Sequence, residues 1–147
     1  MCDNFVLCGE SVKPGATKRY LLNLLTRFAD TTILENNSTF QHEAACWWIE
    51  DLEQRTNEDL KDTALIQRYL LSLLYFSTRG DSWSNKDLWL SKSDVCHWHG
   101  IDCYQSSDMK GIINKIRLVR NNLNGILPAE IGQLEPVKYC NLRIKFI

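Results

Sequence analysis

The chain has 147 residues, 44% of them hydrophobic and 24% charged, which allows one globular domain with a modest core and excludes a disordered protein. The formal net charge of -1 gives no reason to expect a nucleic-acid partner, although residues 30 to 62 are acidic and residues 110 to 147 are basic. No apolar run reaches the roughly 18 residues that span a bilayer, and residues 1 to 13 lack the pattern of a signal peptide.

Two helices are predicted before residue 60. Thr17 can cap the first, which has one apolar face made of Leu21, Leu24, Leu25 and Phe28. The second begins at Ser38, which forms a capping box with Gln41. Its apolar face is made of Phe40, Ala44, Trp47, Trp48 and Leu52. We interpret the two adjacent tryptophans as core residues and not as a platform for a ligand.

The segment Asn36-Asn37-Ser38-Thr39, where the second helix is expected to start, contains two overlapping acceptor sequences for asparagine-linked glycans. Such sequences are used only in a chain that enters the secretory pathway, and they often occur by chance. Alone they carry little weight.

The longest predicted helix runs from Asp62 to Ser77. Its apolar residues are Leu65, Ile66, Tyr69, Leu70, Leu73, Leu74 and Phe76. This face is too wide for a surface helix, so other elements must cover it. We expect the helix to stop at Gly80, because glycine adopts a positive φ without steric penalty.

Three ordered features follow from Leu73 onward. Residues 73 to 83 read LLYFSTRGDSW, and Trp89-Leu90 comes next. Residues 96 to 103 read CHWHGIDC, which contains the pattern W-x-G-[VI]-x-C. Residues 113 to 134 follow I-x-x-I-x-L-x-x-N-x-L-x-G-x-L-P-x-x-I-G-x-L. The positions Ile113, Ile116 and Leu118 recur 24 residues later as Val137, Cys140 and Leu142.

Over residues 60 to 147 the chain therefore resembles the N-terminal cap and first one and a half repeats of plant-type leucine-rich-repeat proteins. The helical run from about residue 40 is also similar to the segment before such caps in algal and diatom relatives. Two positions depart from the pattern: Leu88 stands where the family has glycine before the tryptophan, and Lys145 stands at the second ladder asparagine.

The resemblance implies an α+β fold, in which N-terminal helices and a disulfide-stapled cap lead into the start of a leucine-rich-repeat solenoid. We divide the chain into a variable segment (1–35), a helical region with the cap (36–111) and the repeats (112–147). The tryptophans suited to covering the first coil are Trp83, Trp89 and Trp98. The Asn121 amide is expected to bond backbone groups at the turn of the coil, and Gly125 and Pro128 to shape that turn.

A disulfide between Cys96 and Cys103 is part of the implied cap and points to an oxidising compartment. Cys140 takes an inward position, where we expect a buried thiol. No partner is evident for Cys2, Cys8 or Cys46.

The function that the resemblance implies is non-catalytic recognition of a protein, peptide or glycan, or scaffolding, on the concave face and without a cofactor. The candidate binding residues alternate outward on two strands 24 residues apart: Lys115, Arg117, Val119, Tyr139, Asn141 and Arg143. They are equally compatible with ordinary solvated strands. Relatives are commonly extracellular or part of membrane-anchored ectodomains.

Three alternatives remain at this stage. Cys96, His97, His99 and Cys103 are all zinc-ligand types, and either histidine could act as base for a cysteine nucleophile. The chain could also be a structural remnant of a receptor-like protein with no binding of its own. Stable solenoids usually need about three repeats and a closing cap. We therefore expect a truncated chain, or one that pairs its open C-terminal end with another chain, including self-association.

Overall fold

The computed structural model describes residues 6–7, 10–11, 16–27, 29–53, 61–134 and 137–145. The helices are α1 (Ala16–Leu25), α2 (Thr31–Glu35), α3 (Phe40–Glu53) and α4 (Asp62–Ser77), with 3-10 turns η1 (Gly80–Ser82), η2 (Val95–His97), η3 (Ser107–Met109) and η4 (Ala129–Gln133). The strands are β1 (Val6–Leu7), β2 (Glu10–Ser11), β3 (Ile101–Cys103), β4 (Ile113–Asn124) and β5 (Tyr139–Lys145). None of the described helices is long and apolar enough to cross a membrane.

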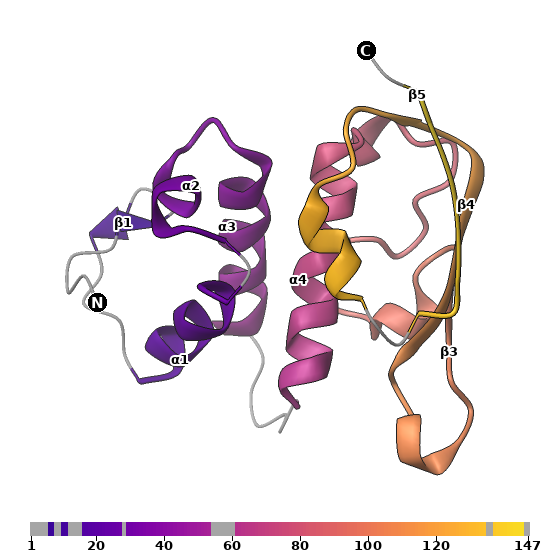
Figure 1. The fold of residues 1–147 in the computed structure, drawn as a ribbon, viewed down its shortest axis with the longest axis horizontal. Coiled ribbons are helices and arrows are strands. Elements are labelled where there is room, and N and C mark those ends of the chain that lie inside the picture. The colour runs from indigo at the N-terminus through magenta and orange to yellow at the C-terminus, as the bar shows by residue number, and fades with distance from the viewer. Residues whose placement is uncertain are drawn as a thin grey trace.

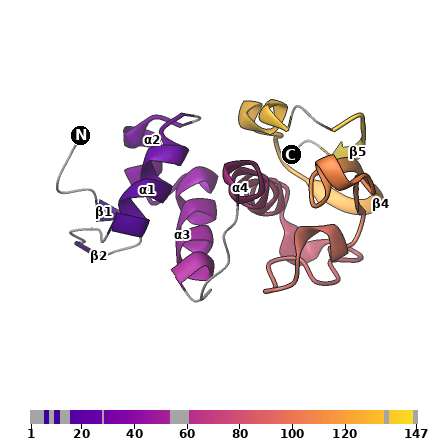
Figure 2. The same ribbon diagram turned by 90° about the horizontal axis from the view of Figure 1, so that it is seen from below.

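Helix α4 lies in the middle of the molecule, with α1, α2 and α3 on one side and the three-stranded sheet β3-β4-β5 on the other (Figures 1 and 2). Ten residues of α4 are buried, among them Leu70, Leu71, Leu73 and Leu74 with no exposed surface. The predictions that this helix spans 62–77 and is covered by other elements are confirmed. Helices and sheet share one hydrophobic cluster, which extends from Leu21 to Leu134.

The start of α3 differs from the prediction by one residue. Thr39, not Ser38, caps the helix, because the Thr39 Oγ1 accepts a hydrogen bond from the His42 N–H at 3.1 Å. Ser38 instead donates its hydroxyl to the Asn36 Oδ1 at 2.6 Å. The expected Ser38–Gln41 capping box is therefore wrong.

The buried face of α3 is also broader than predicted. Trp48 is fully buried, and Ala45 and Ile49 are buried as well because α3 packs against both α2 and α4. Phe40 was predicted in this face, but at the first helical position it remains 46% exposed.

Arg79, and not Gly80, takes the left-handed conformation after α4, with a φ of 53°. Gly80 is required for a different reason: a Cβ atom there would lie 2.0 Å from the ring of Tyr75. The prediction that the helix stops before this glycine is confirmed, but the residue with the positive φ is Arg79.

In the sheet, β4 pairs with β3 in antiparallel fashion and with β5 in parallel fashion. The parallel register places Ile116 opposite Cys140 and Leu118 opposite Leu142, which is the 24-residue spacing read from the sequence. Ile116 and Leu118 are 1% and 0% exposed, so these positions face the core as expected.

Cys140 is exposed, which corrects the expectation of a buried thiol. It lies opposite the buried Ile116, but β5 has a neighbouring strand on one side only within the described residues. A side chain at an inward position of such an edge strand is covered by a neighbouring strand on one side only, so it stays exposed.

Candidate ligand-binding face

Asn121 joins the sheet to the loop before it. Its side chain is buried, its Nδ2 donates to the Asn85 carbonyl at 2.7 Å, and its Oδ1 accepts from the Asn85 N–H at 2.6 Å. Its own carbonyl accepts from the Ser84 N–H. The asparagine thus satisfies loop groups whose burial without partners would be unfavourable. Gly125 is equally constrained, because a Cβ atom there would lie 2.1 Å from the Ser77 carbonyl oxygen.

Trp83, Trp89 and Trp98 form a buried row of rings. The centroids of Trp83 and Trp89 are 4.8 Å apart, and those of Trp89 and Trp98 are 5.0 Å apart. Each indole N–H donates to a backbone carbonyl, so burial leaves none of these donors without a partner. Tyr75 of α4 contacts the first two rings and ties the row to the helix.

The guanidinium of Arg68 lies between the rings of Trp47 and Trp98, with its Cζ 5.2 and 5.1 Å from their centroids. It forms a bidentate ion pair with Asp51 at 2.7 and 3.0 Å, and it donates to the carbonyls of Ser91 and Ser93. Arg68 therefore joins α3, α4 and the loop that contains Ser91 and Ser93 in one network. In the sequence, the only sign of these contacts is an arginine among the apolar residues of the predicted helix.

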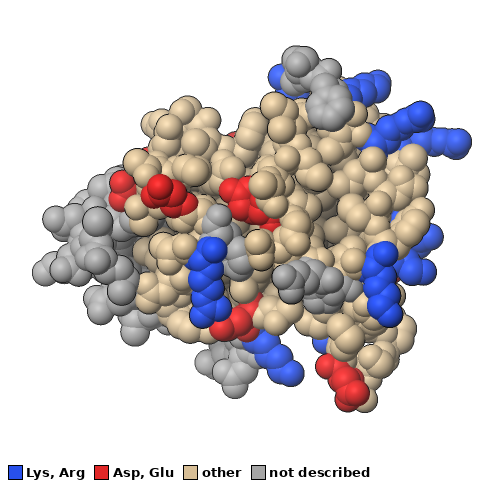
Figure 3. Space-filling model, in the orientation of Figure 1, with Lys and Arg blue, Asp and Glu red and all other residues tan. Residues whose placement is uncertain are grey.

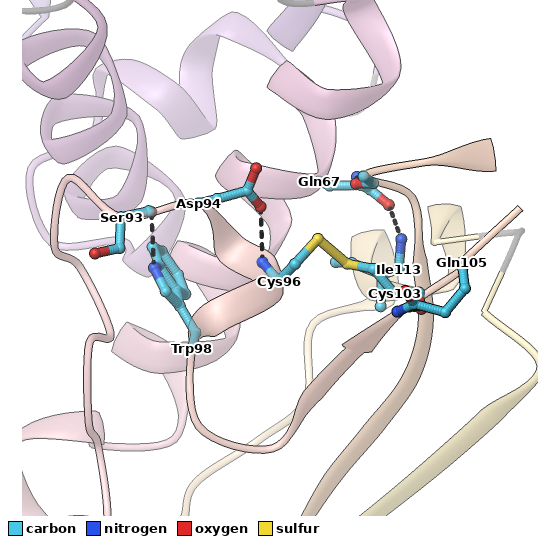
Figure 4. The surroundings of a disulfide bond; sticks show 9 residues. Gln67, Ser93, Asp94, Cys96, Trp98, Cys103, Gln105 and Ile113 are labelled. Atoms are coloured by element: carbon cyan, nitrogen blue, oxygen red, sulfur yellow. Dashed lines mark hydrogen bonds between the residues drawn. A yellow bond between two sulfur atoms is a disulfide. The ribbon is translucent and has the colours of Figure 1, made fainter. Parts of the chain in front are cut away.

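Cys96 and Cys103 are joined in a disulfide, with Cα atoms 5.5 Å apart, which links η2 to β3 (Figure 4). Near it, the Asp94 carboxylate accepts from the Cys96 N–H and the buried Gln67 accepts from the Ile113 N–H. Gln67 thereby connects α4 to the first residue of β4, a contact that the sequence did not indicate.

The disulfide bears on the zinc and nucleophile alternatives at this loop. Its two sulfurs are bonded to each other, so neither is a thiolate that could bind zinc or act as a nucleophile in this structure. Within the described ranges, no three His, Cys, Asp or Glu residues are grouped to hold a metal. His97 is exposed, and the backbone N–H of His99 donates to the Asp87 carbonyl. Cys46 is also disulfide-bonded, which was not foreseen, whereas Cys2 and Cys8 lie outside the described residues.

The thiol of Cys140 is a weak candidate for nucleophilic chemistry. Partial burial by its neighbours raises the pKa of the Cys140 thiol above its usual value. Since the thiolate is the reactive form, a raised pKa lowers reactivity at neutral pH.

The six predicted face residues come from β4 and β5. Lys115 pairs with Tyr139 and Arg117 pairs with Asn141, so the structure brings these four together. No such pairing joins Val119 to Arg143, because the register shifts after Leu118. The exposed members of the set are Lys115, Arg117, Val119, Tyr139 and Arg143, and Asn141 is half-buried.

Local contacts shape this face. The Asn141 Nδ2 donates to the Tyr139 hydroxyl at 3.2 Å. Arg117 forms an ion pair with Asp102 of β3 at 2.6 Å, so its charge is partly compensated. Lys138 lies 5.7 Å from the ring centroid of Tyr104, beside the same strands. Asp102, Tyr104 and Lys138 were not predicted, because their contacts depend on β3 and on the loop before β5.

Charge is unevenly distributed over the molecule. In the view of Figure 3, lysine and arginine side chains gather toward the side where the sheet lies, and most of the acidic side chains lie over the helices. On this face, the acidic middle and the basic C-terminal part of the sequence therefore lie toward different sides.

No protein-family profile matches the chain, and no solved structure matches it. A curated protein, phytosulfokine receptor 2 of Arabidopsis thaliana, is 32% identical to it over 54 residues. The matched stretch covers 37% of this chain and 5% of the receptor. The chain is thus similar, over a little more than a third of its length, to a small part of a plant receptor.

Proposed function

We propose that the chain is a non-catalytic recognition module of the leucine-rich-repeat type, which binds a protein, peptide or glycan through the exposed face of β4 and β5. In this proposal α4 and the tryptophan row cap the first coil of a solenoid, and Asn121 is its ladder asparagine. The module belongs to an extracellular or membrane-anchored receptor-like protein. Two observations support this proposal. Part of the chain is similar to a plant receptor, and its repeat pattern resembles that of plant-type leucine-rich-repeat proteins.

One observation carries the proposal: two parallel strands pair residues 24 positions apart and present neighbouring outward side chains. Each coil that stacks in such an arrangement adds one strand to a continuous face. The buried Ile116 and Leu118 behind this face hold it against the core.

The chemistry of the face favours a ligand with acidic and planar groups. Lys115 and Arg143 are exposed cations, and Tyr139 provides an aromatic ring that is 47% exposed. Tyrosine and arginine side chains are enriched where binding energy is concentrated in interfaces. The ion pair with Asp102 links the Arg117 guanidinium to β3.

The test is capture by the full chain on arrays of peptides and glycans, compared with the double variant Lys115→Glu/Arg143→Glu. We expect the array signals of the wild-type chain to fall at least tenfold in the double variant. Lys110→Glu, an exposed cation at the end of η3, is the matched control and should leave them unchanged. Equal loss in the control would contradict the proposed face, and a folded chain that captures nothing would favour the structural remnant.

A further inference from the structure

The turn between α2 and α3 has no part in the proposed recognition, yet it contains the only two Asn-x-Ser/Thr sequences in the chain. We propose that Asn37 is the acceptor of an asparagine-linked glycan and that Asn36 is not. Such glycans are bulky and hydrophilic, and the fold must leave them in solvent.

The two asparagines differ in how the fold holds their side chains. The Asn36 Oδ1 accepts hydrogen bonds from the backbone N–H and the hydroxyl of Ser38, at 3.0 and 2.6 Å, which fixes the amide against the turn. Asn37 is exposed, and no hydrogen bond engages its side chain within the part of the chain that the structure describes. A sugar on the Asn37 Nδ2 can therefore project into solvent without displacing a contact.

The rest of the turn is maintained by bonds that do not involve Asn37. The Thr39 Oγ1 donates to the Ile33 carbonyl and accepts from the His42 N–H, which caps α3. The turn lies at the end of the helical half of the molecule, away from β4 and β5 (Figure 1). A glycan there leaves the proposed binding face uncovered.

The disulfides indicate the compartment in which the chain would receive a glycan. Disulfides at Cys96–Cys103 and at Cys46 are typical of oxidising compartments, where glycan transfer also occurs. Glycan transfer to this chain therefore rests on the secretory location proposed above.

The transfer joins the Asn37 Nδ2 to the anomeric carbon of an oligosaccharide and breaks the bond from that carbon to a polyprenyl diphosphate. The diphosphate leaves, and the amide nitrogen loses one proton to the surrounding base.

The test is secretion of the full chain from eukaryotic cells behind a cleavable leader, followed by peptide N-glycosidase F and mass spectrometry. We expect one glycan, released as an aspartate at position 37. Asn37→Gln keeps the acceptor sequence of Asn36 and should abolish the glycan. Asn36→Gln and Ser38→Ala keep the acceptor sequence of Asn37 and should retain it.

Circular dichroism is used to check that each secreted variant is folded. A glycan that persists in Asn37→Gln, or an unmodified wild-type chain, would overturn the assignment. Either result leaves the proposed recognition untouched, because the array test uses variants of the sheet alone.

Discussion

Asn121 holds both backbone groups of Asn85 through a side chain that is only 3% exposed. Replacing it with leucine removes both partners of the half-buried Asn85 backbone groups, so we expect Asn121→Leu to lower the free energy of unfolding by about 1–3 kcal/mol. Urea denaturation followed by tryptophan fluorescence measures the change. Asn23→Leu, at an exposed position of α1, is the control and should stay within about 0.5 kcal/mol of the wild type. Equal stability of Asn121→Leu and wild type would contradict this role.

Leu88 adopts a left-handed backbone conformation, with a φ of 64°, at the position where the resembled family has glycine. A side chain with a Cβ atom pays roughly 1–2 kcal/mol in this region, and glycine loses about 0.5–1 kcal/mol of chain entropy on folding. We therefore expect Leu88→Gly to unfold at a higher temperature than the wild type, by a few degrees. Leu88→Ala keeps the strain and should not gain stability. A Gly variant no more stable than the Ala variant would count against strain at this position.

The single-residue features also show where sequence reasoning reaches its limit. The capping of α3 was assigned to Ser38 although Thr39 performs it, because both residues are good caps and their order in the chain does not distinguish them. The positive φ after α4 was assigned to Gly80, whereas Arg79 adopts it and Gly80 is required by its close approach to Tyr75. Such choices depend on neighbours that lie beyond the local sequence.

At the level of elements, Arg68 connects α4 to α3 and to the loop that contains Ser91 and Ser93. Removing one partner of a buried ion pair leaves the other charge uncompensated, so we expect Asp51→Ala to lower the free energy of unfolding by about 3–5 kcal/mol. The double variant Asp51→Ala/Arg68→Met should be destabilised by less than the sum of the two single variants. Thermal and urea denaturation of all four proteins gives the coupling energy, and strict additivity would contradict a coupled network.

A milder change tests the geometry of the same network. Lysine cannot reproduce the bidentate contact with Asp51, the bonds to Ser91 and Ser93, or the stacking between two indole rings. Arg68→Lys should therefore also reduce stability and change the fluorescence of Trp47 and Trp98. An Arg68→Lys protein with unchanged stability and emission would indicate that charge alone suffices.

The disulfide fixes the segment between η2 and β3. Its removal in Cys96→Ala/Cys103→Ala frees the unfolded chain, and the short loop predicts a loss of roughly 2–3 kcal/mol. Denaturation of the oxidised and variant proteins in parallel measures this loss. If the variant were as stable as the oxidised protein, the disulfide would not stabilise this segment.

The helices and strands were predictable to different degrees. The limits of α4 follow from its apolar periodicity and from the glycine after its last turn, and both signals are local. The polar contacts of α4 were not predictable, because Gln67 meets Ile113 at the start of β4 and Arg68 meets Asp51 across a helix pair. In the candidate face, alternation predicted which residues point outward, but the ion pair of Arg117 with Asp102 requires knowing that β3 pairs with β4.

For the molecule as a whole, the edge of the sheet has consequences for assembly. Strand β5 has a partner on one side only among the described strands, and its Cys140 is exposed. Unpaired strand edges favour pairing with another chain. We therefore expect concentration-dependent self-association in sedimentation velocity under reducing conditions. Arg27→Glu, an exposed position just after α1 on the helical side of the molecule, should leave it unchanged, and a strictly monomeric chain at high concentration would contradict the expectation.

The central proposal is that recognition takes place on the sheet and not on the helices. Tyr139 of β5 and Tyr20 of α1 are both 47% exposed, so they report on the two sides of the molecule with similar starting reactivity. Hydroxyl-radical footprinting of the full chain, with and without a ligand captured on the arrays, compares them within one sample. We expect bound ligand to lower the oxidation of Tyr139 severalfold and to leave that of Tyr20 unchanged. Protection of Tyr20 with Tyr139 still fully reactive would contradict it.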